Sequence, residues 1–447
     1  MAEIGGAKRY DVVILGASGF TGKYVVREAL KFLQAPNSPL KSLALAGRST
    51  SRLSQALKWA AAPNPPPGIP LLAADTSDAG SLSRLAAQSR IILNCVGPFR
   101  LYGEPVVRAC VESGCDYLDV SGEPEFMEKM EAAYHDAAAG KGSLIVSACG
   151  FDSIPAELGF FFHSKHWIEP SVPNRIEAYL SLESDKKIVG NFGTYESAVL
   201  GVANSDQLMK LRSSRPRRTR PKIPGPAPPR DLFEHQKELR LWALKLPSAD
   251  SVVVRRTLST LAENPEGLPG THESDANAES RRAFWSSVKP AHFGVKIANR
   301  SLLGLFPLVV LGAFFALLCR WSLGRRLLLQ FPSFFSLGGF RKEGPSEEQV
   351  GSASFKMWFV GKGFSDEGKA AAADTEVITR VTGPEIGYVT TPIVLVQCAL
   401  ILLRRRGDLP GGGVYTPGIV FGPTDLRDRL QENGISFDFV SRKAISD

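Results

Sequence analysis

The feature that most constrains the fold is a glycine-rich turn near the N-terminus, between a short apolar segment and an amphipathic one. Residues 10–15 (YDVVIL) are followed directly by Gly16-Ala17-Ser18-Gly19-Phe20-Thr21-Gly22. This G-x-x-G-x-x-G spacing suits a strand-to-helix turn in which glycines allow a tight bend, a close approach to phosphate and close helix–strand packing. The free N–H groups and the dipole at a helix N-terminus favour an anion. The sequence therefore predicts a dinucleotide-binding turn at residues 16–22.

The first 160 residues alternate short apolar runs with helical segments. Hydrophobic residues make up 44% of the 447-residue chain and charged residues 22%, which excludes a wholly disordered chain or a coiled coil. Alternating strands and helices predict right-handed crossovers and a parallel sheet with helices on both faces. We therefore predict an α/β fold with an N-terminal Rossmann domain, a doubly wound parallel sheet. Its six expected strands lie within residues 10–17, 40–47, 70–75, 90–96, 116–121 and 143–150.

The pattern changes beyond residue 160. Residues 175–184, 352–364 and 375–383 alternate like strands of a mostly antiparallel sheet, so residues 161–395 are expected to form a second α+β domain. This domain contains a basic, Pro-rich loop at 212–230, interpreted as a solvated linker, and an apolar segment at 302–319. Residues 396–447 are predicted to form C-terminal helices and a strand that pack back on the core, with the GGGVYTPG motif as a loop.

The residues that end the strands predict which dinucleotide is bound. An NAD site usually has Asp or Glu after the second strand, to bind the ribose 2′-hydroxyl. Here Arg48 and Ser49 occupy that place and can bind a 2′-phosphate, which favours NADP(H) over NAD(H). Asp75 ends the third strand, near the expected adenine. The fourth strand ends with the residues expected beside the nicotinamide, namely Asn94, Cys95, Val96, Gly97 and Pro98.

The apolar run from Leu302 to Cys319 has eighteen residues without a charge. A helix of that length would extend about 27 Å, close to the ~30 Å hydrocarbon core of a bilayer. A buried core helix is the alternative. Basic residues flank the run on both sides, and Trp285 and Trp321 lie nearby, so a helix dipping into one leaflet and a spanning helix are both consistent with the sequence. We predict membrane association, and the N-terminus has no secretory signal pattern.

Charge and cysteine content limit the partners. The net charge of +8 permits anionic partners, but the basic loop has no interleaved aromatic residues, so nucleic-acid binding is not expected. The six scattered Cys residues do not form a disulfide framework. His163 and His166 lie three residues apart without a third ligand in view, so no metal site is predicted.

Candidates for proton transfer are few. The chain has no Tyr-x-x-x-Lys pair, no P-loop motif and no G-x-S-x-G, which argues against short-chain dehydrogenase chemistry, nucleotidases and α/β-hydrolases. Several polar residues follow the fourth, fifth and sixth expected strands, at the same sheet edge as the nicotinamide. Among them we predict Tyr102 and Glu123 as the catalytic residues. Asp119, Cys149 and Asp152 have structural interpretations that are at least as good, as a buried acid, a buried apolar thiol and a helix cap.

The motifs GASGFTG, ALAGRS, NCVGPF, YLDVSGE and ACGFDSIPAELG, in this order, resemble the saccharopine dehydrogenase-like oxidoreductase family. The resemblance extends over nearly the whole chain. It is closer to the eukaryotic membrane and lipid-droplet branch, and to trans-acting enoyl reductases, than to enzymes of lysine synthesis. It implies a Rossmann NAD(P) domain, oxidoreductase activity, a mitochondrial-membrane or lipid-droplet location and, by way of the bacterial branch, a role in glycolipid synthesis.

These observations lead to one main interpretation and two alternatives. The main one is a membrane-associated NAD(P)-dependent oxidoreductase that acts on a lipid-linked or otherwise hydrophobic small molecule at a membrane or droplet surface. A homodimer is one option for its assembly. The first alternative is a soluble saccharopine-type amino-acid dehydrogenase, in which residues 302–319 are core. The second is a non-catalytic nucleotide-binding scaffold on a lipid surface.

Overall fold

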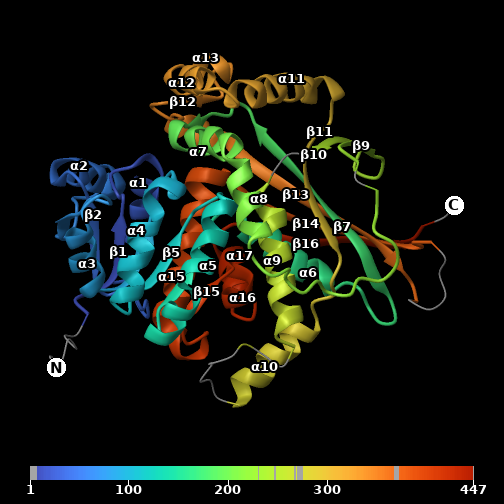
Figure 1. Ribbon diagram of the computed structural model, residues 1–447, viewed down its shortest axis with the longest axis horizontal. Helices are drawn as coiled ribbons and strands as arrows, with labels where there is room; N and C mark the ends of the chain where they lie inside the picture. The colour runs from blue at the N-terminus through green and yellow to red at the C-terminus, as the bar shows by residue number, and fades with distance from the viewer. Residues whose placement is uncertain are drawn as a thin grey trace. The chain divides into compact units, whose positions relative to one another are not determined.

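The computed structural model describes residues 8–229, 231–245, 248–265, 268, 275–366 and 372–445, and the chain divides into two compact units. The first unit contains Met1–Gly150 and Gly387–Val420, and the second contains Phe151–Gly267, Asp275–Ile386 and Phe421–Asp447. The observed division after Gly150 precedes the expected boundary at 160. The expected C-terminal segment 396–447 is shared between the units. Each unit is described by itself (Figure 1).

The first unit is a parallel sheet with strand order β15-β6-β5-β4-β1-β2-β3. This order confirms the predicted Rossmann class. β1 and β2 are almost entirely buried, as expected of strands covered by helices on both faces. The neighbours β1 and β4 mark the point where the chain changes direction across the sheet, and ligands bind outside the carboxyl ends of such strands. The strands are β1 (Tyr10–Leu15), β2 (Leu43–Gly47), β3 (Leu71–Ala73), β4 (Ser89–Asn94), β5 (Asp116–Asp119), β6 (Leu144–Val146) and β15 (Gly413–Tyr415).

Local signals determine where several helices of this unit begin and end. The hydroxyl of Ser49 accepts the N–H of Arg52 and caps α2, and the carboxylate of Asp78 accepts the N–H of Gly80 and caps α3. Gly142, at φ 70°, ends α5 in the left-handed conformation that glycine tolerates. The helices are α1 (Phe20–Leu30), α2 (Thr50–Ala61), α3 (Ala79–Ala87), α4 (Phe99–Glu112), α5 (Pro124–Lys141) and α15 (Thr391–Arg405), and α16 (Pro417–Phe421) follows β15.

The C-terminal segment of the first unit differs from the prediction. The GGGVYTPG motif, expected as a loop, contains β15, which pairs in parallel with β6 and adds a seventh strand to the predicted six. The preceding apolar helix α15 packs against α1. By length and composition α15 with its flanking turns could cross a membrane, but 83% of its apolar window is buried inside the protein. We therefore interpret it as a core helix.

The second unit contains a mixed sheet with order β16-β14-β13-β7-β11-β10-β9. β7 and β11 are parallel, and the other neighbours are antiparallel. This confirms the predicted strands around 175–184, 352–364 and 375–383. The strands are β7 (Val172–Ser184), β9 (Phe233–Gln236), β10 (Leu241–Lys245), β11 (His292–Asn299), β13 (Ala353–Phe364), β14 (Thr375–Pro384) and β16 (Ser436–Ala444), and β8 (Gly190–Asn191) pairs with β12 (Phe340–Arg341).

Helices cover this second sheet and its edges. Helix α6 lies close to β13 at Gly159, where an added Cβ would be only 2.2 Å from the Phe359 ring. The other helices are α7 (Phe192–Ala203), α8 (Ser205–Ser213), α9 (Ala249–Glu263), α10 (Asp275–Ser286), α11 (Leu302–Cys319), α12 (Ser322–Gln330), α13 (Pro332–Phe335), α14 (Glu347–Ser352) and α17 (Leu426–Glu432), and α6 itself spans Ile154–Ser164.

The Pro-rich loop at 212–230 is anchored rather than free. Arg218 forms an ion pair with Glu263 of α9 at 2.6 Å. The amide of Asn174 donates to the carbonyls of Pro224 and Pro226 at 2.6 and 3.0 Å. Its first residues complete α8, and residue 230 lies outside the described residues. These contacts hold the loop on the second unit, while none of residues 212–229 is buried, which is consistent with the expected solvated loop.

Candidate dinucleotide site

The glycine turn has the geometry that a dinucleotide requires. Gly16 lies at φ +81°, and a Cβ there would be 2.7 Å from the Val96 side chain. A Cβ on Gly22 would lie 2.1 Å from the Gly16 carbonyl oxygen, so only glycine lets α1 start this close to β1. Gly16, Ala17, Ser18 and Gly19 form the turn, and Phe20, Thr21 and Gly22 form the first residues of α1.

The N-terminus of α1 is suited to an anion. Its N-cap residue is Gly19, which has no side chain to accept the first N–H groups of the helix. Those groups and the helix dipole favour negative charge at this point. A Cβ on Gly19 would meet only the Gly16 carbonyl oxygen, at 3.1 Å. The turn therefore fits a pyrophosphate through backbone groups.

Arg48 and Asp75 lie close enough for their charges to interact, after β2 and β3 respectively. The pKa of Asp75 is lowered, mainly because the backbone N–H and the hydroxyl of Ser77 donate to its carboxylate, and Arg48 adds to the effect. Arg48 is exposed, whereas the Ser49 hydroxyl already accepts the N–H of Arg52 as the α2 cap. Arg48 is thus available to a phosphate, while Ser49 and Asp75 also have local structural roles.

The residues after β4 form a bend whose polar groups are partly in use. The Asn94 amide donates to the Tyr117 hydroxyl at 3.1 Å, and its oxygen accepts the N–H of Val96 at 3.0 Å. Burial raises the pKa of the Cys95 thiol to about 12, and Asp119 adds to the shift, so this thiol stays protonated near neutral pH. Gly97 and Pro98 lead into α4, whose N-cap is Pro98. Asn94 shapes the bend that leads from β4 into α4.

The two predicted catalytic residues lie in different environments. Both carboxylate oxygens of Glu123 accept backbone N–H groups, from Phe99 and Arg100, each at 2.9 Å. Glu123 therefore satisfies the first turn of α4, which has no side-chain cap of its own. Tyr102, on the first turn of α4, is 42% exposed. Its ring is accessible to solvent in the described structure. The catalytic assignment of both residues stays a prediction.

Asp119 is the buried acid at the carboxyl end of β5. Its Oδ1 atom accepts the N–H groups of Ser121 and Ala148, at 2.9 and 2.8 Å. Burial nevertheless raises its pKa to about 6. Asp119 thus connects the ends of β5 and β6 while titrating near neutral pH. The motif YLDVSGE placed Asp119 at this edge, but one of its two partners, Ala148, lies 29 positions later, which sequence spacing alone does not show.

A second group of carboxyls lies within the second unit, and no motif in the sequence points to its central member, Asp250. Asp250, at the start of α9, is 4% exposed, and its Oδ1 has no hydrogen-bond partner in the part of the chain that the structure describes. Burial and the neighbouring Asp152 raise its pKa to about 7. Glu157 of α6 accepts the hydroxyl of Thr257, which joins α6 to α9. Ser153, not Asp152, is the N-cap residue of α6.

The two histidines considered for metal binding are packing residues. Nδ1 of His163 lies 2.9 Å from the Thr379 hydroxyl, and burial lowers the His163 pKa to about 3. A Cβ on Gly361 would lie 2.2 Å from His163 Nε2, so the ring fills space against β13. Among the described residues no group of three or more His, Cys, Asp or Glu side chains could hold a metal ion.

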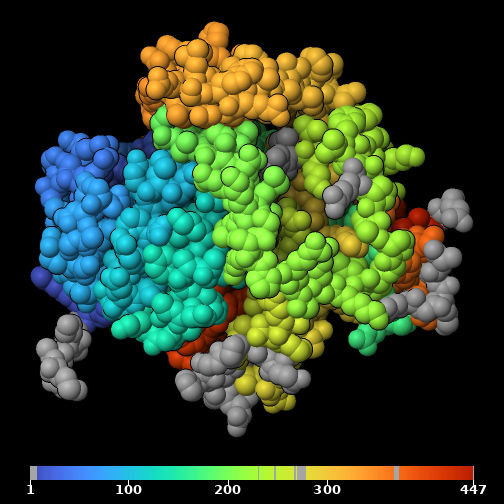
Figure 2. Space-filling model, in the orientation of Figure 1, coloured from blue at the N-terminus to red at the C-terminus, as the bar shows by residue number. Residues whose placement is uncertain are grey.

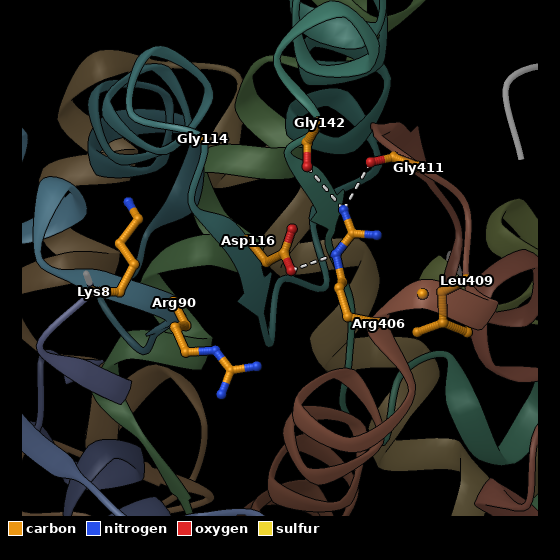
Figure 3. A pocket seen from close by; sticks show the side chains of 9 residues that line it. Lys8, Arg90, Gly114, Asp116, Gly142, Arg406, Leu409 and Gly411 are labelled. Carbon is orange, nitrogen blue, oxygen red and sulfur yellow. Dashed lines mark hydrogen bonds and ion pairs between the residues drawn. The ribbon is translucent and has the colours of Figure 1, made fainter. Parts of the chain in front are cut away.

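A pocket of about 440 Å³ lies at the opposite, amino edge of the parallel sheet (Figure 3). Arg406 crosses it and donates to Asp116 at 2.7 Å and to the carbonyls of Gly142 and Gly411 at 2.9 and 2.8 Å. Lys8 donates to the carbonyls that end α3 and α4. These cations serve the fold, and the pocket is remote from the carboxyl strand ends where dinucleotides bind.

The sheet order, the glycine turn and the cation after β2 define the class of Rossmann α/β proteins that bind a dinucleotide. The family model of the saccharopine dehydrogenase NADP-binding domain matches residues 12–146. A probable mitochondrial saccharopine dehydrogenase-like oxidoreductase of Arabidopsis thaliana is 67% identical over 97% of both chains. The chain belongs to the saccharopine dehydrogenase-like family of NADP-binding oxidoreductases, as its motifs indicated.

Two further comparisons add to this assignment. A lipid droplet localized protein of Caenorhabditis elegans is 34% identical, with the alignment covering 97% of this chain and 99% of that one. Among solved structures, apo saccharopine dehydrogenase (L-Glu forming) from Saccharomyces cerevisiae matches 98% of this chain and 100% of its own, with a TM-score of 0.51. At 12% identity this structural likeness supports the fold alone.

Proposed function

We propose that this protein is an NADP(H)-dependent oxidoreductase that acts on a lipid-linked or hydrophobic small molecule at a membrane or lipid-droplet surface. The nucleotide-binding part of the proposal rests on one observation. The N-terminus of α1, at the turn that contains Gly16 and Gly22, has no side-chain cap, and Arg48 follows β2. In this proposal the turn holds the pyrophosphate and Arg48 binds the 2′-phosphate, which gives the preference for NADP(H). When bound, the nicotinamide supplies or accepts the hydride.

The hydrophobic-substrate part of the proposal is supported by α11. This apolar helix is exposed along most of its length, with only 11% of it buried. Contiguous apolar surface of this size marks an interaction site rather than ordinary solvent-facing surface. The names of the two relatives, mitochondrial and lipid droplet localized, suggest the membranes concerned. A surface that concentrates apolar molecules favours a role in lipid or glycolipid metabolism.

Hydride transfer also needs a group that gives or takes a proton. Both oxygens of Glu123 accept backbone N–H groups, so protonating it would weaken the first turn of α4. The exposed hydroxyl of Tyr102 carries no such structural cost. Of the two candidates we therefore favour Tyr102 as the proton-transfer residue, with Glu123 holding α4 in place. Changing Tyr102 to Phe should lower turnover while leaving the affinity for NADPH within about twofold of the original.

The test of the nucleotide assignment is binding of NADPH and of NADH to the full-length protein in mild detergent. Arg48→Ala should weaken NADPH about 10- to 100-fold and leave NADH unchanged, because it removes one charge-assisted phosphate contact. Lys58→Ala removes another exposed cation, in the last turn of α2, and is the matched control that should change neither affinity. Gly19→Asp places a carboxylate at the α1 N-terminus and should abolish binding of both nucleotides.

The outcomes separate the proposal from its alternatives. If Lys58→Ala weakens NADPH as much as Arg48→Ala does, the preference comes from overall positive charge and the Arg48 assignment fails. If NADPH binds but is never consumed, the non-catalytic nucleotide-binding scaffold becomes the better description, and if neither nucleotide binds the original protein, the nucleotide part of the proposal fails. If NADPH is oxidised with a keto acid and an amino acid but with no hydrophobic substrate, a soluble-type amino-acid dehydrogenase replaces the lipid proposal.

A further inference from the structure

We propose that α11, α12 and α13 form a flat apolar plate, residues 302–335, that lies in the plane of a single phospholipid leaflet and does not cross the membrane. This inference deepens the proposed function, because it rests on the membrane association proposed there and specifies its geometry. The plate belongs wholly to the second unit. In Figure 2 it is the orange layer at the top of the view, with the green α7 beneath it.

The plate exposes many large apolar side chains, and their contact with water is energetically unfavourable. Leu303 is 81% exposed, Phe306 66% and Phe334 75%. A surface helix of a soluble protein has one apolar stripe and one polar face, whereas α11 is apolar on every side. Only Leu305 and Cys319 of α11 are buried. The outward side of α11 therefore needs an apolar environment that this unit does not provide.

The packing of α11 shows how it is oriented on the unit. Near its N-terminal end, Leu305 is buried and the helix contacts β10 and β11. Near its C-terminal end, Cys319 packs with Tyr195 and Val199 of α7, and the helix also contacts α12. Leu305 and Cys319 are fourteen residues apart, which corresponds to about 21 Å along a helix. The helix is thus attached to the unit near both of its ends. Between Leu305 and Cys319, Leu311, Phe315 and Leu318 are half-buried and the other residues are exposed, and Figure 1 shows α11 at the top of the view.

This attachment disfavours a spanning orientation. A helix that crosses a bilayer is surrounded by lipid over about 30 Å of hydrocarbon. Here one side of the helix is partly covered by protein and both of its ends are anchored, so crossing would carry polar parts of α7 and β11 into the hydrocarbon at a high cost. Lying flat, the same helix buries its outward side to a depth of about 5–10 Å and leaves the rest of the unit in water.

The charges around the plate fit an anionic lipid surface. From Ser301 to Lys342 the sequence has no Asp or Glu, whereas it has Arg320, Arg325, Arg326, Arg341 and Lys342. Arg320, Arg326 and Lys342 are exposed in the structure. Trp321, 56% exposed, lies between α11 and α12, where an amphipathic ring can rest at the headgroup level. An apolar plate with cationic edges matches phospholipid headgroups above acyl chains.

Depth measurements on the full-length protein test the orientation. Leu303, Val310 and Leu317 lie seven residues apart on one side of α11, and all are exposed. Each is changed singly to Cys, spin-labelled, and its depth measured in vesicles of phosphatidylcholine and phosphatidylserine. The unsubstituted protein, labelled in the same way, corrects for native cysteines. The in-plane plate predicts equal depths within about 5 Å, whereas a spanning helix predicts a gradient of about 21 Å.

A matched pair of charged variants tests the surface itself. Phe306→Glu should reduce vesicle binding at least tenfold, and Leu232→Glu should not, although Leu232 is 68% exposed in the same unit. A depth gradient with vesicle binding retained overturns the in-plane geometry but leaves the proposed membrane location. If the original protein does not bind vesicles, both the in-plane geometry and the membrane location are overturned. Both are also overturned if the protein forms a dimer in buffer and Phe306→Glu dissociates that dimer. NADPH binding, measured in parallel, reports on the oxidoreductase assignment independently of either result.

Discussion

Two glycines of the first unit lie in helices but tolerate a methyl group very differently. A Cβ on Gly22 would lie 2.1 Å from the Gly16 carbonyl oxygen, whereas nothing lies within 4 Å of a Cβ on Gly140, near the end of α5. We expect Gly22→Ala to lose at least about 2 kcal/mol of unfolding free energy, with NADPH binding abolished. Gly140→Ala should gain up to about 1 kcal/mol. Chemical denaturation and NADPH titration of both variants measure this. Equal effects would mean that α1 can move away from β1.

The raised pKa of Asp119 leads to a prediction about how folding stability depends on pH. Its folded pKa of about 6 exceeds the ordinary 3.8, so between these values the folded state holds more protons than the unfolded state. The stability contribution of Asp119 is therefore full below about pH 4 and declines as the pH rises through 6, by about 3 kcal/mol in all. Asp119→Asn keeps an acceptor for Ser121 and Ala148 but cannot ionise, so its stability relative to the original protein should rise from pH 4 to pH 7.

Denaturation curves of the two proteins at several pH values between 4 and 7 provide the check on Asp119. The control is Asp78→Asn, which changes an exposed carboxylate that caps α3 in the same unit. Asn and Asp cap helices about equally well, so the stability of this variant should differ little from that of the original protein at each pH. A flat difference between Asp119→Asn and the original protein would show that the Asp119 carboxyl titrates normally in the folded state.

Residues differ in how far the sequence predicts their roles. The roles of Gly16 and Gly22 in the turn were predictable because they depend on neighbours within a few positions of a strand end, whereas the phosphate contact of Arg48 stays a prediction. The role of Glu123 was not predictable, because its carboxylate accepts N–H groups from Phe99 and Arg100 across a loop. Motif spacing places a side chain at a sheet edge, but hydrogen bonds between distant segments decide whether that side chain is already in use.

At the scale of elements, the strands buried on both faces were predicted well and β15 was missed. Its three residues begin with the last of three consecutive glycines, a composition typical of loops. β15 becomes a strand because β6 offers an unpaired parallel edge, and because His135 of α5 accepts the N–H of Val414. Pairing partners contributed by other segments are invisible to local propensity, which explains the miss.

The segment between α15 and β15 leads to a prediction about Arg406. This side chain joins the end of α15 to Asp116 of β5 and to the carbonyls of Gly142 and Gly411. Arg406→Ala would leave the mostly buried Asp116 without its cation and should cost about 2–4 kcal/mol of unfolding free energy. Arg405→Ala, its neighbour, breaks a half-exposed pair with Asp408 and should cost less than about 1 kcal/mol. Urea denaturation distinguishes them, and equal losses would refute the structural role of Arg406.

At the scale of the whole molecule, the two compact units do not follow the order of the chain. The expected boundaries follow the sequence from domain to domain, whereas the first unit is assembled from Met1–Gly150 and Gly387–Val420. The discrepancy arises because α15 is apolar on nearly all sides, so from sequence it suits any core. Its packing on α1, β4 and β5 assigns it to the nucleotide-binding unit.

This division predicts which amides NADPH protects from hydrogen exchange. A ligand at 100 times its Kd stabilises the unit that binds it by about 2.7 kcal/mol, which slows exchange through unfolding of that unit about 100-fold. If the first unit unfolds cooperatively, slowly exchanging amides of β15 and α15 should gain the same protection as those of β1 and β4, despite some 300 intervening residues. Gly19→Asp, with NADPH present, is the control and should show no gain in any of them. Protection of β1 and β4 without β15 would show that the C-terminal segment opens separately, and that the nucleotide-binding unit consists of the N-terminal 150 residues alone.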